Sequence, residues 1–169
     1  MVMSRLLSVL LVFSLLPVDA AEREIQGKHL RIGLNQSLES LGPGAKVTLI
    51  AQVKLAPGMH VYAPSNEPPY RPIRLALEPA HGVKISAVHY PEAKKLHLDA
   101  IDETVPVYEG SFTLTAEAVV APGAKAGDVV INGRLNYQTC DDKICYLPVT
   151  IPVTWTVKIT PASAAHSGQ

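Results

Sequence analysis

The residues in this sequence best suited to chemistry are its two cysteines, Cys140 and Cys145. Four residues separate them, and alternating strand-like segments precede and follow. Two thiols at this spacing can close a disulfide and open it again, which makes exchange with another protein's sulfur the chemistry to consider. A structural disulfide is the alternative, because two cysteines in an exported chain normally form a bridge.

The short loop between the cysteines favours exchange. In the chain-entropy model a loop of this size stabilises a fold by about 2 kcal/mol, against about 3 kcal/mol for a loop of fifteen residues. A core built by the rest of the chain does not need so small a contribution. We therefore interpret the pair as placed for access rather than for stability, with the structural bridge still open.

The apolar alternation around the cysteines predicts an irregular hairpin. Cys140 is in phase with the polar positions of residues 129–139, whereas Cys145 is in phase with the apolar positions of residues 147–159. A regular hairpin would set a polar face against an apolar one, because a one-residue shift turns every side chain over. We therefore expect a β-bulge or an irregular turn near the cysteines, and a distorted bridge that is easier to reduce.

Two prolines after the pair indicate a sheet edge. Pro148 and Pro152 share one parity in the expected strand, and neither has an N–H to donate to a neighbouring strand. We therefore expect one side of residues 147–152 to be unpaired or covered by a loop. The cysteine hairpin would then lie where another protein's sulfur can reach it.

The remainder of the chain consists of short strand-like segments that must position this hairpin. Apolar and polar residues alternate over 47–55, 112–118 and 147–159, and no segment keeps a helical period. Turn signals that contain Pro-Gly separate the segments, at 57–58 and 122–123. Shorter candidate strands are 29–34, 73–78, 83–88 and 129–139. The pattern predicts an all-β fold of two packed antiparallel sheets, with a barrel as the alternative.

Both ends of the chain are expected to lie outside this domain. Arg5, the apolar run at 6–16 and the small residues before Ala21 form a signal-peptide pattern, too short for a membrane-spanning helix of about 20 residues. An uncleaved N-terminal anchor is the alternative. The expected division is a signal peptide over 1–20, a β-sandwich domain over 21–160 and a disordered tail over 161–169, with residues 21–27 fraying. We expect an exported protein with no stable membrane insertion.

Composition argues against several classes of function. The chain has 15 basic and 15 acidic residues and no basic run, so nothing indicates a nucleic-acid partner. No catalytic triad, phosphate-binding loop or carboxylate pair is visible, and we expect no cofactor. A soft metal site made by the two cysteines with His60 or His97 is a minor alternative, because their spacing is long for zinc. We expect a monomer without a bound metal.

The cysteine hairpin resembles that of a known redox family. Residues 137–148 read Tyr-Gln-Thr-Cys, a four-residue turn, then Cys-Tyr-Leu-Pro, and are similar to the active-site hairpin of the N-terminal periplasmic domain of the thiol–disulfide interchange protein DsbD. Residues 55–62 and 107–110 are similar to two further segments of that family. The resemblance implies a periplasmic, immunoglobulin-like antiparallel β-sandwich. It also implies a redox-active cysteine pair that receives electrons from a membrane partner and passes them to oxidised exported proteins.

Roles for individual residues follow from both lines of argument. We expect Cys140 to bond with partners and Cys145 to resolve the mixed disulfide, while the resemblance implies the reverse assignment as an alternative. Tyr62 and Tyr146 are candidates for packing beside the pair and excluding water, and Asp99 for hydrogen-bonding a thiol. The alternatives are ordinary half-buried strand tyrosines and a solvated loop aspartate.

Two departures from the family change the expectations. Full-length members continue into a membrane domain and a thioredoxin-like domain, whereas this sequence ends after the first, so we expect a stand-alone domain supplied with electrons by another polypeptide. The family's cap loop carries an aromatic residue, but residues 96–103 contain none, so Leu98 or Ile101 would have to cover the cysteines.

The sequence thus predicts a protein-disulfide oxidoreductase of the reductase kind. Its expected partners are thioredoxin-like redox proteins and a membrane electron donor. The rival from another functional class is a non-catalytic β-sandwich that binds a partner through its sheet edge and contains a structural disulfide.

Overall fold

The computed structural model of the chain describes residues 23–99 and 102–161. All regular structure in these residues is β-strand. The strands are β1 (Arg23–Gly27), β2 (Leu30–Gln36), β3 (Ser40–Leu41), β4 (Lys46–Leu55), β5 (His60–Tyr62), β6 (Arg74–Leu77), β7 (Val83–Ile85), β8 (Lys94–Leu98), β9 (Glu103–Glu109), β10 (Ser111–Val120), β11 (Gly127–Tyr137), β12 (Thr139–Cys140) and β13 (Val149–Ile159). The predicted signal peptide and the predicted tail beyond Pro161 lie outside the described residues.

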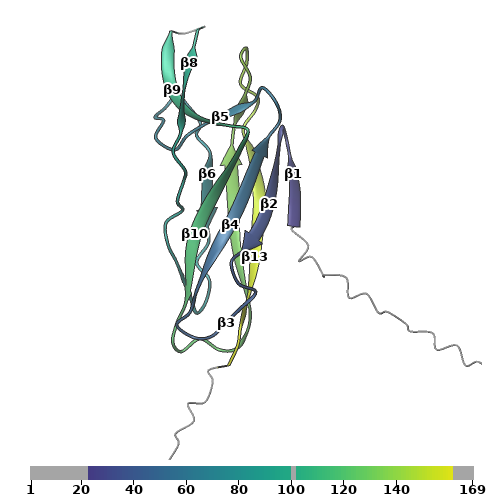
Figure 1. The fold of residues 1–169 in the computed structure, drawn as a ribbon, viewed down its shortest axis with the longest axis vertical. Helices are drawn as coiled ribbons and strands as arrows, with labels where there is room; N and C mark the ends of the chain where they lie inside the picture. Colours follow the sequence, from purple (N-terminus) through teal and green to yellow (C-terminus); the bar gives the residue numbers. More distant parts are fainter. Residues whose placement is uncertain (1–22, 100–101, 162–169) are drawn as a thin grey trace, which may run out of the picture.

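Two sheets pack face to face and form the body of the molecule (Figure 1). One sheet has the order β1-β2-β4-β10-β7 and the other the order β3-β13-β11-β6. Every pairing in them is antiparallel except the short parallel contact between β3 and β13. The fold is an immunoglobulin-like antiparallel β-sandwich, which confirms the predicted fold class.

The predicted alternation produces the core of this sandwich. Every second side chain of β4, from Val47 to Leu55, is buried, and β13 repeats the pattern from Ile151 to Ile159. The two inner faces meet in one hydrophobic cluster that includes Trp155, whose indole N–H donates a 2.9 Å hydrogen bond to the carbonyl of Asn35. Each aliphatic side chain buried in this way contributes about 1.5–3 kcal/mol to folding, so the sandwich is the main source of stability.

A third, smaller sheet stands at one end of the sandwich and includes one of the cysteines (Figure 1). Its order is β12-β5-β9-β8, and β8 and β9 form a hairpin that projects beyond the sandwich. This sheet has its own apolar cluster, which is separate from the main core. The buried members of that cluster are Tyr62, Val105, Val107 and Cys140.

The predicted sheet edge is confirmed. On one side β13 pairs with β11 along its whole length, but on its other side it pairs only at Lys158 and Ile159, with β3. No other described strand pairs with β13 on that second side. The prolines therefore lie on a side where no neighbouring strand needs a backbone N–H from them.

Two expectations about local structure are wrong. The segment expected to fray forms β1 from Arg23 onward and pairs with β2 over five residues, because Ile25 packs against the core and supports the strand. The segment taken as a cap loop, residues 96–103, is only partly loop, because it includes the end of β8 at 96–98 and the start of β9 at Glu103. Within residues 23–99 and 102–161 there is no helix that could cross a membrane.

Candidate redox site

The cysteines lie just beyond the regular hairpin of β11 and β13. The last pair of that hairpin is Tyr137 opposite Val149, and the next bridge is Cys140 opposite Cys145. Two residues, 138 and 139, separate these bridges on the incoming side, whereas three, 146–148, separate them on the outgoing side. The outgoing side therefore has one extra residue. This slip is the irregularity that the strand phases predicted.

Hydrogen bonds satisfy the backbone of the irregular segment. The N–H of Tyr146 donates to the carbonyl of Thr139 at 2.9 Å, and the side-chain amide of Gln138 donates to the carbonyl of Tyr146 at 2.8 Å. These bonds replace the ladder that a regular hairpin would have made. Thr139 and Cys140 then leave β13 and pair as β12 with His60 and Val61 of β5.

The two cysteines are joined in a disulfide, yet their exposure differs. Cys140 is 1 % exposed, because β12 belongs to the small sheet and Cys140 packs in its apolar cluster, while Cys145 is exposed. Ile144 and Leu147 near it are also exposed, at 56 % and 79 %. The strand phases had put Cys140 with the polar positions and Cys145 with the apolar ones. The observed burial is the reverse, because the chain changes sheets between β11 and β12.

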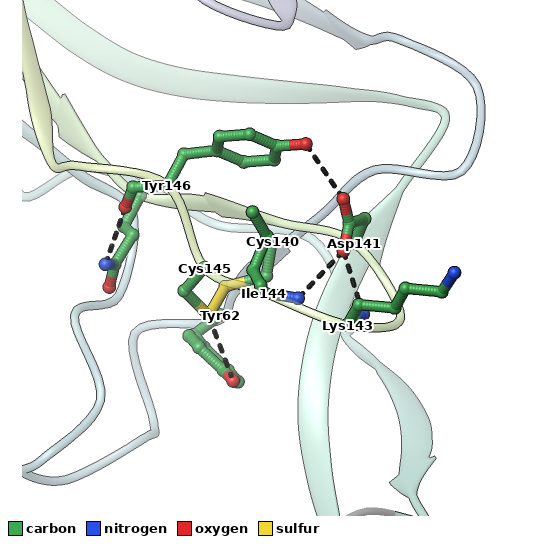
Figure 2. The surroundings of a disulfide bond; sticks show 8 residues. Tyr62, Cys140, Asp141, Lys143, Ile144, Cys145 and Tyr146 are labelled. Carbon is green, nitrogen blue, oxygen red and sulfur yellow. Dashed lines mark hydrogen bonds between the residues drawn. A yellow bond between two sulfur atoms is a disulfide. The ribbon is translucent and has the colours of Figure 1, made fainter.

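Asp141 organises the turn between the cysteines (Figure 2). One carboxylate oxygen accepts hydrogen bonds from the backbone N–H groups of Lys143 and Ile144, and the other accepts one from the Tyr146 hydroxyl, all at 2.8 Å. These hydrogen bonds lower the pKa of Asp141, and the one from Ile144 has the largest effect. The same carboxylate raises the pKa of Tyr146. Tyr146 thus braces the turn through Asp141.

Tyr62 approaches the disulfide from β5 (Figure 2). Its hydroxyl lies 3.8 Å from Sγ of Cys145, and burial, followed by the charge of Glu103, raises its pKa. Its ring contacts the ring of Tyr70, with centroids 4.6 Å apart, and Tyr70 in turn donates a hydrogen bond to Glu103. Tyr70 could not be predicted from the sequence, because it precedes β6 in a proline-rich segment without strand periodicity. An aromatic residue thus contributes to the site from outside the cap segment.

The end of the β8–β9 hairpin closes one side of a cavity of about 300 Å³ that both cysteines line. Leu96 and Leu98 of the hairpin pack against the small apolar cluster that includes Cys140, so Leu98 lies where a cover was expected. The other candidate for covering the pair, Ile101, lies outside the described residues.

Asp99 lines the same cavity, but its carboxylate lies 3.4 Å from Nε2 of His97, and no hydrogen bond from it to a cysteine is found in the part of the chain that the structure describes.

His60 belongs to the same site, although the sequence suggested it only as one ligand of a metal site. It stands opposite Cys140 on one side of β5 and opposite Glu109 on the other, and it is 2 % exposed. Burial lowers its pKa, against the opposing effect of Glu109, Asp142 and Asp141. Across the described residues, no three His, Cys, Asp or Glu side chains are grouped to hold a metal ion.

A protein-family model matches most of the chain. The family is described as "Thiol:disulfide interchange protein DsbD, N-terminal", and the match covers residues 33–156, which include both cysteines and the residues around them. No curated protein matches the chain in sequence.

Solved structures have a similar arrangement of strands. The N-terminal periplasmic domain of ScsB from Proteus mirabilis superposes with a TM-score of 0.55 and 14 % identity, over 80 % of this chain and 49 % of that one. This chain therefore spans about half the length of that structure's chain. At this identity the likeness to the ScsB domain shows the fold.

Two structures from Neisseria meningitidis are also similar. The reduced N-terminal domain of DsbD has a TM-score of 0.41 and 17 % identity, over 65 % of this chain and 77 % of that one. A complex between the DsbD N-terminal and PilB N-terminal domains has a TM-score of 0.40 and 16 % identity, over 63 % of this chain and 73 % of that one.

Proposed function

We propose that this chain, which belongs to the family of DsbD N-terminal domains, carries out thiol–disulfide exchange in the periplasm through Cys140 and Cys145. It passes reducing equivalents between redox partner proteins. The observation that carries the proposal is the unequal exposure of the two bonded cysteines, with Cys140 at 1 % and Cys145 exposed. The exposed cysteine offers a partner's thiolate a sulfur within reach, and the buried one is shielded from competing thiols.

The exchange starts at the exposed sulfur. A partner's thiolate forms a bond with Sγ of Cys145, while the bond between the two cysteines breaks and leaves its electron pair on Sγ of Cys140. A second thiolate of the partner then attacks the partner's own sulfur in the mixed disulfide and releases Cys145. The partner has lost two electrons, and the two cysteines have gained them and take up two protons. The reverse sequence passes the electrons to an oxidised protein.

This proposal gives Cys145 the partner-bonding role and Cys140 the resolving role. The assignment is the one implied by the family resemblance and the reverse of the one we favoured from the sequence. In-line attack on a disulfide requires an open path to the sulfur, and the burial of Cys140 by β5 and the small apolar cluster argues against such a path. The Tyr62 hydroxyl, 3.8 Å from Sγ of Cys145, is placed to hydrogen-bond the thiolate that forms there.

The partners we propose are thioredoxin-like redox proteins and a membrane electron donor. A reacting partner must bring an exposed thiolate to Cys145, and the exposed Ile144 and Leu147 provide an apolar rim on which its surface can dock. Apolar residues beside a reactive sulfur favour a protein partner over a small charged thiol, because docking removes their surface from water.

Trapping with single-cysteine variants tests the proposal. We would mix reduced Cys140→Ser and Cys145→Ser, separately, with a thioredoxin-like protein whose only cysteine is bonded to thionitrobenzoate. Attack by the protein's thiolate releases coloured thionitrobenzoate and leaves a covalent complex on a non-reducing gel. Cys140→Ser should react at least about tenfold faster than Cys145→Ser, because its remaining thiol is exposed. The variant with both cysteines replaced by serine is the control and should form no complex.

The opposite results would contradict the proposal in different ways. Faster trapping by Cys145→Ser would restore Cys140 as the partner-bonding sulfur. If neither variant forms a complex, and the wild-type disulfide resists millimolar glutathione, the exchange proposal is wrong. The protein would then be a binding domain with a structural disulfide.

A further inference from the structure

His60 has a buried ring nitrogen without a hydrogen-bond partner among the described residues. The residue is 2 % exposed, and the unpartnered atom is Nε2. Leaving a buried polar atom without a partner destabilises a fold, so an apolar side chain at this position in β5 would make a more stable one. Such an atom requires an explanation, and a role in the reaction is one.

The position of His60 suggests what its nitrogen interacts with. His60 and Cys140 are directly opposite in the antiparallel pair of β5 and β12, so their side chains project to the same face with Cβ atoms about 4.5–5.5 Å apart. Both residues line the cavity that also contains Cys145 and Tyr62. The Tyr62 hydroxyl already faces Sγ of Cys145. The site therefore provides one polar side chain for each sulfur.

The charges around His60 suit a residue that gains a proton during the reaction. Burial lowers its pKa, so the ring is neutral at neutral pH and can accept a proton. Three carboxylates oppose this lowering of the pKa: Glu109 of β9, which stands opposite His60 in the strand pair, and Asp141 and Asp142 of the cysteine turn. Their negative charge stabilises the imidazolium once it forms.

We propose that Nε2 of His60 accepts the proton of the Cys140 thiol when Cys140 resolves a mixed disulfide. In this step Cys145 is bonded to a partner's sulfur and Cys140 is a thiol. As Nε2 takes the proton, the electron pair on Sγ of Cys140 forms the bond to Sγ of Cys145, and the partner leaves as a thiolate. The partner has gained two electrons. The imidazolium then loses its proton to solvent or to the partner's thiolate.

This inference rests on the proposed function, because it concerns a step of the exchange itself. It adds a catalytic residue to the cysteine pair. It also explains how the buried cysteine can react. Burial disfavours the thiolate form, so the Cys140 thiol needs a nearby base before it can attack.

Single-turnover exchange separates the two steps. The reduced protein is mixed with the thioredoxin-like partner whose only cysteine is bonded to thionitrobenzoate. Colour release reports the attack by Cys145, and the disappearance of the covalent complex on acid-quenched gels reports the resolution by Cys140. We would compare wild type, His60→Gln and His29→Gln from about pH 6 to about pH 9.5, a range that spans the ordinary titration of histidine and cysteine.

We expect His60→Gln to release colour at the wild-type rate but to accumulate the complex. Its resolution should be slower by about tenfold or more near pH 7, which is a modest effect for loss of a general base. The difference should vanish at high pH, where hydroxide removes the thiol proton without help. His29→Gln should resolve like wild type, because His29 also has a buried, unpartnered Nε2 in the described structure but packs on Tyr146 and does not line the cavity.

A second variant guards against a defect in folding. His60→Phe keeps a ring and removes the unpartnered nitrogen, so it should unfold at the wild-type temperature or above it and should still resolve slowly. Equal resolution rates for wild type and His60→Gln at every pH would overturn the role of His60 and leave the proposed function intact. A slowing that is the same at every pH would also overturn it, because it would indicate altered packing. If wild type itself releases no colour, both proposals fail.

Discussion

In the sandwich, long strands bury every second side chain, whereas the short strands β5 and β12 at the cysteine end bury consecutive ones. Along β4 the odd-numbered residues are buried while the even-numbered ones are at least partly exposed, but all three residues of β5 are buried. Val61 belongs to the main core, and its neighbour Tyr62 belongs to the small cluster beside the cysteines. β5 is therefore covered on both faces, by the sandwich on one and by the small cluster beside the cysteines on the other.

The comparison shows how one chain separates stability from chemistry. The sandwich removes a large apolar area from water with residues that carry no reactive group, and this burial drives folding. The cysteine end buries residues with polar groups, such as His60 and Thr139, at sites where an apolar residue would cost less. We therefore expect mutations in the sandwich to affect mainly the free energy of unfolding, and mutations at the cysteine end to affect mainly exchange.

The largest effect on stability should come from the sandwich. Leu114 of β10 is completely buried, and Leu114→Ala should lower the free energy of unfolding by about 2–5 kcal/mol, because it leaves a cavity in the core. Denaturant titration measures the change. The exposed neighbour Thr113 provides the control, since Thr113→Ala should change the free energy by no more than about 0.5 kcal/mol. Similar small losses for both variants would remove the basis of the comparison.

Opening the disulfide should have a smaller effect. Replacing both Cys140 and Cys145 by serine should lower the free energy of unfolding by about 2 kcal/mol at most and leave the fold intact, because the bond closes a very short loop. Denaturant titration of reduced wild type is the matched control, since it loses the bond but keeps both sulfur atoms in place. Loss of the folded state in either sample would show that the cysteine end also holds the molecule together.

The smallest expected effect is on the local stability of the turn between the cysteines and on how that stability depends on pH. Because hydrogen bonds lower the pKa of Asp141 in the folded state, its contribution is fully present above the ordinary value of 3.8 and is lost as the pH falls through the lower folded value. The protection factors of the Lys143 and Ile144 amides, which correct for the pH dependence of unprotected exchange, should therefore stay constant from neutral pH down to about pH 4 and fall in stronger acid. Asp141→Asn should exchange faster throughout this range.

The neighbouring aspartate is a control for that measurement. Asp142 is exposed and accepts no hydrogen bond within the described structure, so Asp142→Asn should leave the protection of the turn unchanged. A carboxyl of Asp141 that titrates at or above the ordinary aspartate value in an NMR titration would contradict the role of these hydrogen bonds.

The long strands and the slip between them could be predicted because both depend on local periodicity. β4, β10, β11 and β13 each have ten or eleven residues, which is long enough for alternation to be recognised. β5 could not be predicted, because a three-residue strand covered on both faces shows no alternation. β8 and β9 were not predicted, because they pack against a small apolar cluster instead of the large core. Few of their side chains are buried, so their apolar pattern is weak.

By itself the sequence determined the cysteine pair proposed to react, the register slip beside it and the sheet edge marked by Pro148 and Pro152. These features follow from the parity of neighbouring residues and from proline's missing N–H, which do not depend on the rest of the fold. Only the tertiary structure decided that Cys140 is buried and Cys145 exposed, and that His60 stands opposite the buried sulfur. Both depend on β5, which comes from a segment about eighty residues earlier in the chain. Burial at a site is determined by whichever segments cover it, and local patterns contain no information about them.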